Sequence, residues 1–474
     1  MTTLFTEYPT SALEVAEAQR LGDALYGEKK RRSKLGQYAT PIEVARLMAG
    51  LFEFSSNEAT RLLDPGMGAG ILSLATIEKF NQARNYGSQI GVTGFEIELP
   101  AYLAAKENFL KASSEGCTLD LNLKPEDFLC EEAPDKGFTH SIINPPYKKL
   151  SAGDHRQKDL REQGIHAVNL YVAFVWKALL ELEEGGQLVA IIPRSFANGT
   201  YYRPFRKFLR DNVIIKQVLL VDQRASVFSA DNVLQENVIV SLLRHSSPTS
   251  ISARTKLTWI DGNDLSPQFE RSIIAQDIWW DSKETCVLRL PKEADAGSFP
   301  NYSLNDLHLK VSTGPVVDFR LQAYLLPAKN AKAYPLLRPR HFAQGRCKWP
   351  QAYGKRAGGI EKCEETEKFF WPVGYYVVVR RISSKEEPRR VVASVVCPSD
   401  FSTSFVCFEN HLNVFHADRK GFSENLAYGL CNYLNSEITD RFLRSISGHT
   451  QVNAGDLRLL PYPSEAELLA YAKT

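Results

Sequence analysis

The sequence predicts an α/β fold in which a doubly wound, mainly parallel sheet fills the first half of the chain. Between residues 40 and 245, short apolar segments suited to buried strands alternate with segments of helical periodicity. Turns rich in glycine or proline follow two of those strands, at 65–70 and 144–147. After about residue 250 the alternation gives way to short strands, aromatic residues and Pro/Gly turns. This change predicts a second domain of mixed α+β structure.

The predicted organisation has three parts: an N-terminal helical segment at 1–30, a first domain at 31–248 and a second domain at 249–474. The formal net charge is only +2, so any nucleic-acid-binding surface has to be local. The eight cysteines form no C-x-x-C pair, which favours free thiols in a reducing compartment. The first residues do not resemble a signal peptide, and no apolar run reaches the roughly 20 residues of a membrane span. We therefore expect a cytoplasmic protein.

Each element of the first domain is predicted from its local pattern. Apolar residues recur at helical spacing in the helices, and Thr40 followed by Pro41 is typical of a helix start. The strands are short apolar runs bounded by turn residues. Residues 153–163 are polar and charged, and we expect a mobile loop there. The predicted helices are 11–30, 42–52, 71–80, 99–112, 165–182 and 203–210, and the predicted strands are 61–64, 91–98, 119–123, 141–143, 187–193, 214–221 and 237–243.

The second domain has a weaker pattern. We expect strands at 377–381 and 391–397, a helix at 424–435 and a strand-like tail at 456–461. Its stretch 337–356 contains no acidic residue, and three aromatic residues lie between its cations Arg338, Arg340, Arg346, Lys348, Lys355 and Arg356. Basic and aromatic side chains together suit phosphates and bases, although a generic basic surface is the alternative.

A glycine-rich turn follows the strand 61–64. Gly66, Gly68 and Gly70 lie between that strand and a helix, where glycines let the backbone approach a ligand closely. Their spacing matches neither the dinucleotide fingerprint nor a phosphate-binding P-loop. Asp64, just before the turn, would repel a pyrophosphate and suits a ligand that carries an ammonium group. A tight turn without a ligand is the alternative.

Two further acidic positions follow the next strands of the predicted sheet. Glu96 stands near the end of the second strand, where an acidic residue commonly accepts ribose hydroxyls, and Glu98 is the alternative ligand. Asp127 and Phe128 follow the third strand, where a carboxylate and a ring could bind the amine and the face of an adenine. An exposed loop aspartate beside a core phenylalanine is the alternative.

The segment Asn144-Pro145-Pro146-Tyr147 ends the fourth strand. Two consecutive prolines have no N–H to donate and fixed φ angles, so the strand has to stop at Asn144. The amide side chain and the Pro145 carbonyl are both acceptors for an amine, and the Tyr147 ring is a surface for a flat base. At the carboxyl end of a parallel strand these groups predict a site for an exocyclic amine on a planar heterocycle.

Taken together, these motifs resemble the gamma class of adenine-N6 DNA methyltransferases from type II restriction–modification systems, as in the TaqI- and PstI-type enzymes. The segments GQYATP, DPGMGAG, FEIE, EDF and NPPY and the Val227-Phe228 loop occur in that family's order, within residues 30–245. The resemblance implies a Rossmann-like S-adenosylmethionine-dependent methyltransferase domain. It places a target-recognition domain after it, because too few residues separate Glu98 from Asn144 to hold one.

The resemblance also implies the cofactor contacts. Asp64 faces the amino-acid end of S-adenosylmethionine, Glu96 accepts the ribose hydroxyls, and Asp127 accepts the adenine amine with Phe128 beside the ring. The remaining implied cofactor residues are Gln37, Tyr38 and Thr40, which close over the ligand, and Gly66, Gly68 and Gly70, which line its approach. No metal is implied.

On the target side, the resemblance implies that Tyr147 stacks on an extruded adenine and that Phe228 covers its other face. Asn144 and Pro145 accept both amine hydrogens, and Asn144 favours adenine because a serine there is more usual for cytosine-N4 transfer. The expected partners are duplex DNA with a short recognition sequence and a cognate restriction endonuclease. The DNA-contact candidates are Arg338, Arg340, Lys348 and Arg356. Methylation of RNA adenine or of protein glutamine through the same pocket is the alternative function.

Overall fold

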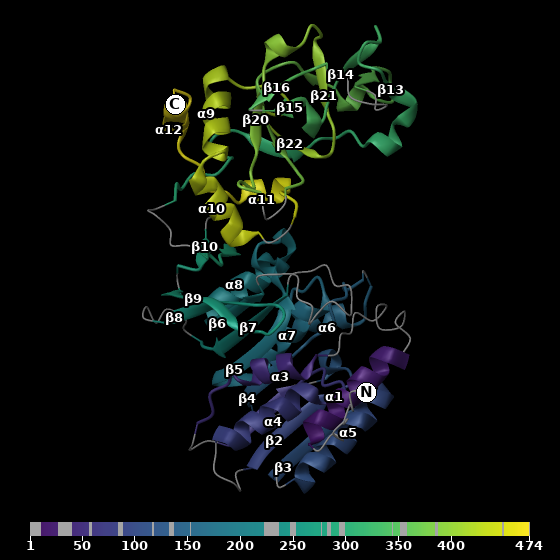
Figure 1. The fold of residues 1–474 in the computed structure, drawn as a ribbon, viewed down its shortest axis with the longest axis vertical. Helices are drawn as coiled ribbons and strands as arrows, with labels where there is room; N and C mark the ends of the chain where they lie inside the picture. The colour runs from purple at the N-terminus through teal and green to yellow at the C-terminus, as the bar shows by residue number, and fades with distance from the viewer. Residues whose placement is uncertain are drawn as a thin grey trace, which may run out of the picture. The chain divides into compact units, whose positions relative to one another are not determined.

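The structure is a computed structural model that describes residues 11–26, 40–55, 59–83, 89–115, 118–131, 137–151, 153–221, 237–246, 253–275, 277–281, 286–292, 299–343, 345–350, 358–383, 387–447 and 450–473. The chain divides into two compact units, Met1–Leu288 and Arg289–Thr474 (Figure 1). In the described residues, no helix has both the length and the apolar character to cross a bilayer.

A nine-stranded sheet with the order β3-β2-β1-β4-β5-β7-β6-β8-β9 organises the first unit. The first five strands run parallel, and β7 then inserts antiparallel between β5 and β6. This arrangement confirms the predicted doubly wound α/β sheet. The strands are β1 Thr60–Asp64, β2 Gln89–Phe95, β3 Thr118–Lys124, β4 Phe138–Ile143, β5 Leu182–Pro193, β6 Val213–Val221, β7 Asn237–Arg244, β8 Arg254–Ile260 and β9 Pro267–Ile274.

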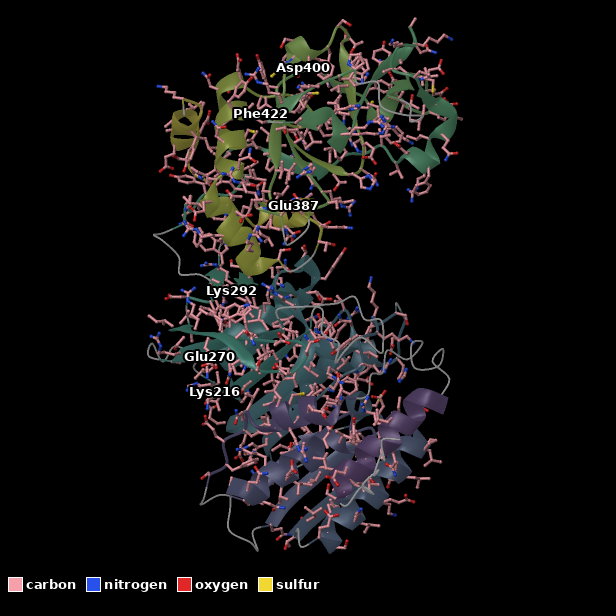
Figure 2. The ribbon with its side chains drawn as sticks, in the orientation of Figure 1. Lys216, Glu270, Lys292, Glu387, Asp400 and Phe422 are labelled. Atoms are coloured by element: carbon pink, nitrogen blue, oxygen red, sulfur yellow. The ribbon has the colours of Figure 1, made fainter. Side chains whose placement is uncertain are left out.

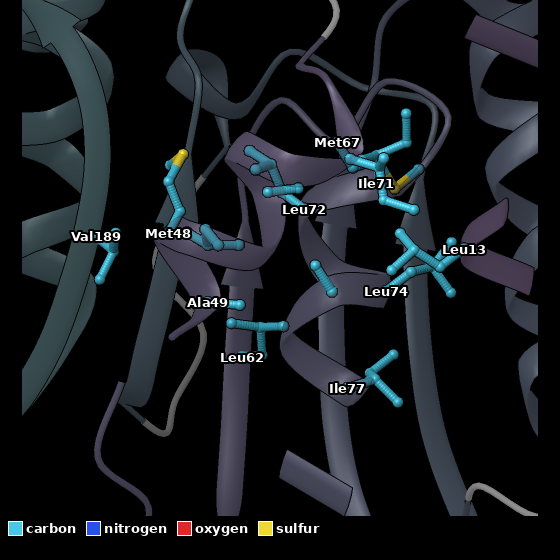
Figure 3. Close-up of a cluster of buried hydrophobic side chains, with 14 of the residues drawn as sticks. Leu13, Met48, Ala49, Leu62, Met67, Ile71, Leu72, Leu74, Ile77 and Val189 are labelled. Atoms are coloured by element: carbon cyan, nitrogen blue, oxygen red, sulfur yellow. The ribbon is translucent and has the colours of Figure 1, made fainter. Parts of the chain in front are cut away.

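The helices of the first unit bury their apolar residues against this sheet. Leu13 and Met48 of two helices pack with Leu62 of β1 and Val189 of β5 in one core cluster (Figure 3). Burial of these side chains is the main favourable contribution to folding of the unit. The helices are α1 Ala12–Tyr26, α3 Ile42–Ala49, α4 Ile71–Ala83, α5 Leu99–Ser114, α6 Arg156–Glu162, α7 Leu170–Glu181 and α8 Arg203–Asn212.

In the segment after β4, the structure differs from one predicted loop and from the predicted start of one helix. The expected mobile loop at 153–163 was wrong, because this segment contains the helix α6, whose Arg156 pairs with Asp154 at 2.7 Å. The expected helix at 165–182 begins only at Leu170, because the Asn169 side chain accepts a hydrogen bond from the Val172 N–H at 3.3 Å and caps the helix. Both differences arose because the composition of a segment does not show where a side chain, in place of a backbone carbonyl, accepts a hydrogen bond from a backbone N–H.

The first unit extends past the predicted domain boundary at 248/249. Strand β8 pairs in parallel with β6, and β9 continues the sheet antiparallel to β8. These two strands were not predicted because exposed charged residues interrupt their pattern of apolar residues. Lys216 of β6 and Glu270 of β9, both labelled in Figure 2, form ion pairs with Glu53 at 2.6 Å and with Lys256 at 2.7 Å.

The second unit combines two sheets with four helices in its described residues. The sheets have the orders β12-β22-β19-β20-β16-β15 and β13-β17-β14-β21-β18. The unit's strands are β12 Lys310–Thr313, β13 Leu325–Leu326, β14 Ala333–Leu337, β15 Phe342–Ala343, β16 Arg346–Cys347, β17 Gly359–Glu361, β18 Trp371–Pro372, β19 Tyr376–Arg380, β20 Ala393–Val396, β21 Phe405–Phe408 and β22 Leu412–His416. Its helices are α9 Glu424–Leu434, α10 Glu437–Ile446, α11 Ala454–Arg458 and α12 Glu465–Tyr471.

Three of the four elements predicted in the second unit occur close to their expected positions, as β19, β20 and α9. The strand-like tail expected at 456–461 was wrong, because α11 begins at Ala454. Asn453 and Asp456 form a capping box there, in which the Asp456 carboxylate accepts the Asn453 N–H at 2.8 Å. The apolar residues that suggested a strand instead pack this short helix into the unit, where Leu457 is fully buried.

Candidate active site

Three of the predicted site segments meet at one edge of the first unit's sheet. Strand β1 ends at Asp64, β2 ends at Phe95 and β4 ends at Ile143. Because these strands are adjacent and parallel, their carboxyl ends lie side by side. The structure therefore brings the glycine turn, the FEIE segment and the NPPY segment together.

The glycine turn after β1 has a backbone that only glycine adopts without strain at two positions. Gly68 has a φ of +54° and Gly70 a φ of +89°. A Cβ on Gly70 would approach the Phe109 ring to 3.2 Å, whereas a Cβ on Gly68 would meet no atom of the described chain within 4 Å. Gly70 thus serves the packing of the turn, and Gly68 borders open space.

The Asp64 carboxylate is fully buried behind this turn. Its Oδ2 atom accepts a hydrogen bond from the Ser73 hydroxyl at 2.7 Å, and its Oδ1 atom has no partner among the described residues. Burial raises the pKa of Asp64 to about 7, and the Ser73 hydrogen bond offsets part of that rise. A buried carboxylate with one unsatisfied oxygen is suited to a cationic ligand.

Glu96 connects the second strand to the glycine turn. Its Oε2 atom accepts the Gly68 N–H at 3.0 Å, and its Oε1 atom accepts the Glu98 N–H at 2.8 Å. Burial raises the pKa of Glu96, while these backbone hydrogen bonds oppose the rise. Of the two candidate ribose ligands, Glu96 is therefore the one that contacts the glycine turn. Glu98 is instead the N-cap residue of helix α5.

Asp127 lies at the start of the short 3-10 helix Phe128–Cys130, after β3. Its Oδ1 atom accepts the Leu129 N–H at 3.0 Å, and its Oδ2 atom accepts a hydrogen bond from Arg156 of helix α6 at 3.2 Å. Arg156 also donates to both oxygens of Asp154, at 2.8 and 2.7 Å. The carboxylate is therefore oriented from two sides.

The Phe128 side chain is buried among aromatic rings. It lies 5.3 Å from the Phe95 ring and 5.7 Å from the Phe174 ring, measured between centroids. The Lys177 ammonium lies 5.0 Å from the Phe128 centroid and donates to the Glu131 carbonyl. Burial lowers the pKa of Lys177. The 3-10 helix is thus held by Arg156 on one side and by Lys177 on the other.

The Asn144 amide is held by two hydroxyl groups. Its Nδ2 atom donates a hydrogen bond to Thr40 Oγ1 at 2.9 Å, and this bond joins two residues that are 104 positions apart in the sequence. Its Oδ1 atom accepts a hydrogen bond from Tyr147 Oη at 3.4 Å. The Tyr147 hydroxyl also lies 3.3 Å from the Ile191 carbonyl of β5. In the described part of the chain, no donor is bonded to the Pro145 carbonyl. The amide orientation is therefore set by the protein, while a second acceptor stays available beside it.

The backbone after the prolines is clamped to the segment before α7. Lys149 forms an isolated antiparallel bridge with Asn169. The Leu170 N–H donates to the Lys148 carbonyl at 2.8 Å, and the Leu150 N–H donates to the Val168 carbonyl at 3.2 Å. The NPPY turn is therefore supported at both ends, by β4 before it and by this bridge after it.

The other predicted site residues are either in the second unit or outside the described residues. Arg338 is buried and donates to both oxygens of Asp318, at 3.1 Å each, so it is not a surface cation as we had expected. Arg340 is half-buried and Lys348 is exposed. The predicted residues Gln37, Tyr38, Phe228 and Arg356 lie outside the described residues.

Three contributors to the site were missed by the sequence reasoning. Ser73 is a lone hydroxyl in the apolar run that follows the glycine turn, and Lys177 is a lone charge in an apolar helix. Both are polar exceptions in apolar segments, a signal that could have identified them. Arg156 had no such signal, because it stands among other charged residues.

The chain is similar to several known methyltransferases. Residues 75–228 match the family described as the Eco57I restriction-modification methylase. The chain is 37% identical to the type II methyltransferase M.BsuBI of Bacillus subtilis over 98% of its own length and 94% of that protein. It is 35% identical to M.PstI of Providencia stuartii, over 99% and 94% of the two lengths. It is also 29% identical to the tRNA1(Val) (adenine(37)-N6)-methyltransferase of Vibrio cholerae, over 34% of this chain and 61% of that protein.

Proposed function

Because the chain belongs to the type II DNA methyltransferases of restriction–modification systems, which use S-adenosylmethionine, we propose that its target is the N6 amine of an adenine extruded from duplex DNA. The observation that carries this proposal is the Asn144 amide, fixed between Thr40 and Tyr147 beside the Pro145 carbonyl, to which no donor from the described residues is bonded. Two acceptors next to an aromatic ring are complementary to an exocyclic amine on a flat base.

The residues at the glycine turn fit S-adenosylmethionine. The unsatisfied, buried Oδ1 atom of Asp64 suits the cofactor's ammonium group, and the open space at Gly68 lets a ligand reach the backbone. Glu96 would accept the ribose hydroxyls, and Asp127 would accept the adenine amine. When bound, the cofactor supplies a methyl group on a positively charged sulfur. Gln37, Tyr38 and Thr40 complete the proposed cofactor-binding set.

The chain's own residues would activate the target amine by position. The lone pair of an adenine amine is conjugated into the ring and is a weak nucleophile. Hydrogen bonds from its two hydrogens to Asn144 Oδ1 and to the Pro145 carbonyl favour a pyramidal nitrogen whose lone pair points away from those acceptors. Fixed acceptors need no reorganisation when positive charge develops on the nitrogen, so orientation and electrostatics supply most of the rate.

An amine inside a duplex cannot be reached, so the target base has to leave the helix. In the proposal, Tyr147 stacks on one face of the extruded adenine and Phe228 covers the other. Arg340 and Lys348 of the second unit remain candidates for DNA contacts, together with Arg356. The biological role proposed is protection of host DNA in the cytoplasm from a cognate restriction endonuclease.

Methylation of RNA is the alternative, since one relative's name gives tRNA as its substrate. That relative matches 34% of this chain, whereas the two type II methyltransferases match 98% and 99% of it. The second unit, Arg289–Thr474, is therefore shared at full length with proteins from restriction–modification systems. This coverage supports DNA as the substrate. Methylation of protein glutamine was the other alternative, and no observation in the structure favours it.

The test is to express the protein in a host free of DNA methylation and to sequence the host DNA by a method that reports modified bases. We expect N6-methyladenine at one short sequence motif. Asn144→Ala should abolish this methylation and leave duplex binding largely intact. Modified cytosine in place of adenine, or normal adenine methylation by the Asn144→Ala variant, would contradict the proposal.

A further inference from the structure

Three segments that contain or flank β4 and β5 have no acidic residue. Residues 137–153, 164–180 and 185–210 carry lysines, arginines and histidines but not one aspartate or glutamate. The whole chain, by contrast, is nearly balanced, with 57 basic and 55 acidic residues. Positive charge is thus concentrated on the segments that build the NPPY turn and its supports. Local concentration of one sign of charge is the electrostatic signature of a polyanion-binding surface.

Most cations in these segments are committed to the fold. Lys177 donates to the Glu131 carbonyl, and Arg206 of α8 donates to the Phe196 carbonyl at 2.8 Å and the Gly199 carbonyl at 2.7 Å. Lys148 and Lys149 differ, since both side chains are exposed and neither has an ion-pair partner within the described ranges. Their backbone is fixed by the bridge to Asn169. Two solvated lysine side chains therefore follow the reactive turn from a fixed backbone.

An exposed aromatic residue, Tyr201, precedes a residue that is bonded to the support of the same turn. Tyr201 is 79% exposed, the highest value among the large hydrophobic residues described. The adjacent Tyr202 hydroxyl accepts a hydrogen bond from Asn169 Nδ2 at 2.9 Å. The Tyr202 ring lies 5.8 Å from the Tyr171 ring, which lies 6.2 Å from the Tyr147 ring. Tyr201 is thus displayed to solvent from a segment anchored to the NPPY support.

We propose that Lys148, Lys149 and Tyr201 form a DNA-contact surface around the target-base pocket. The two ammonium groups bind phosphates that flank the extruded nucleotide, and the Tyr201 ring stacks on a base left in the neighbouring strand. A DNA strand fits this surface because it presents negative charges at regular spacing together with flat bases, which match paired cations and an exposed ring. The inference rests on the proposed function.

The lysine part is tested by the salt dependence of binding. The probe is a labelled 30-base-pair duplex that contains the motif found by sequencing the methylated host DNA. Removing two phosphate contacts in Lys148→Ala/Lys149→Ala should lower the slope of log K against log salt by about 1.8, since each contact contributes about 0.9. Cofactor affinity should not change. The matched control is Lys106→Ala/Lys256→Ala, which removes the same charge from helix α5 and strand β8 and should keep the wild-type slope.

The tyrosine part is tested with 2-aminopurine in place of the target adenine, because this base becomes more fluorescent when it leaves the stack. We expect Tyr201→Ala to lower the fluorescence of the bound duplex and to keep the wild-type salt slope. Tyr201→Phe, which retains the ring, should restore the signal. Equal fluorescence in wild type and Tyr201→Ala would overturn the stacking role, and an unchanged slope in the lysine variant would overturn the phosphate role.

Failure of the proposed function and failure of the DNA-contact surface would give different experimental results. If the wild-type protein leaves host DNA unmethylated at adenine, the proposed function fails. If wild type methylates adenine and both the lysine and Tyr201 variants bind and extrude the target as wild type does, only the surface assignment fails. A lower salt slope in the lysine variant and lower base extrusion in Tyr201→Ala, both with unchanged cofactor affinity, would support the proposed DNA-contact surface.

Discussion

The turns after β1 and after β4 lie at the same sheet edge but are built in opposite ways. The turn after β1 uses glycines, leaves open space at Gly68, and keeps the Asp64 Oδ1 atom buried without a partner in the described structure. The turn after β4 uses two prolines, and both ends of the Asn144 amide have partners inside the protein. The first turn has space for a ligand and a carboxylate oxygen without a partner among the described residues. The second turn holds its amide in a fixed orientation.

This difference matches what a ligand and a reacting group each require. A cofactor that enters and leaves needs space and a complementary charge, whereas an acceptor that aligns a reacting amine needs a fixed orientation. Substitutions in the first turn should therefore change cofactor affinity, and loss of the Tyr147 hydroxyl in the second should change kcat.

Asp64→Asn should weaken S-adenosylmethionine binding by about 10- to 100-fold, the usual range for a hydrogen bond to a charged group. The wild-type carboxyl has a pKa of about 7, so it loses its negative charge as the pH falls below that value. Wild-type affinity should therefore fall by up to about tenfold per pH unit below 7, and the variant's affinity should not. Titration calorimetry from pH 5.5 to 7.5 measures both. Parallel pH profiles would contradict the assigned role of Asp64.

Gly68→Ala should lower cofactor affinity roughly tenfold, equivalent to about 1.4 kcal/mol, because a methyl group would enter the space proposed for the ligand. Gly185 is the matched control. It also has a positive φ, +80°, and open space around its Cβ position, but it lies between Glu184 and Gly186 near the start of β5. Each variant should lose about 1–2 kcal/mol of stability, measured by chemical denaturation. Equal cofactor affinity in the two variants would remove Gly68 from the site.

Tyr147→Phe should lower kcat by roughly fivefold, equivalent to about 1 kcal/mol for one lost hydrogen bond. The hydroxyl orients Asn144 Oδ1, and the ring that stacks on the base is retained. The effect should therefore appear in kcat measured at saturating DNA and cofactor, with little change in KM for DNA. A larger effect on KM than on kcat would show that the hydroxyl acts in binding instead.

Arg156→Ala should have the smallest effect, a loss of about two- to threefold in cofactor affinity. Arg156 orients Asp127 but is 19% exposed, and such ion pairs contribute less than about 1 kcal/mol. Arg161→Ala on the same helix is the control, because Arg161 is exposed and contacts Gln157 at 3.4 Å rather than Asp127. Identical affinities for the two variants would show that Asp127 needs no support from α6.

Much of the first unit could be predicted from local pattern alone. Apolar runs of strand length and helical periodicity identified β1 to β7, and Asp64, Glu96 and Asn144 were predicted as site residues at the ends of three of these strands. The second unit was harder to predict, because its strands are short and its pattern of apolar residues is irregular. In the basic stretch, charge alone did not reveal that Arg338 is buried against Asp318 while Lys348 is exposed.

The sequence by itself determined strands β1 to β7, the two turns and the chemical types of the groups at the sheet edge, because these depend on side-chain periodicity and on the backbone limits of proline and glycine. The tertiary structure decided which groups are free to act. It brought three pairs of side chains into hydrogen-bonding contact: Thr40 with Asn144, Arg156 with Asp127, and Ser73 with Asp64. Such partnerships join separate segments, so they follow only from how the helices and strands pack.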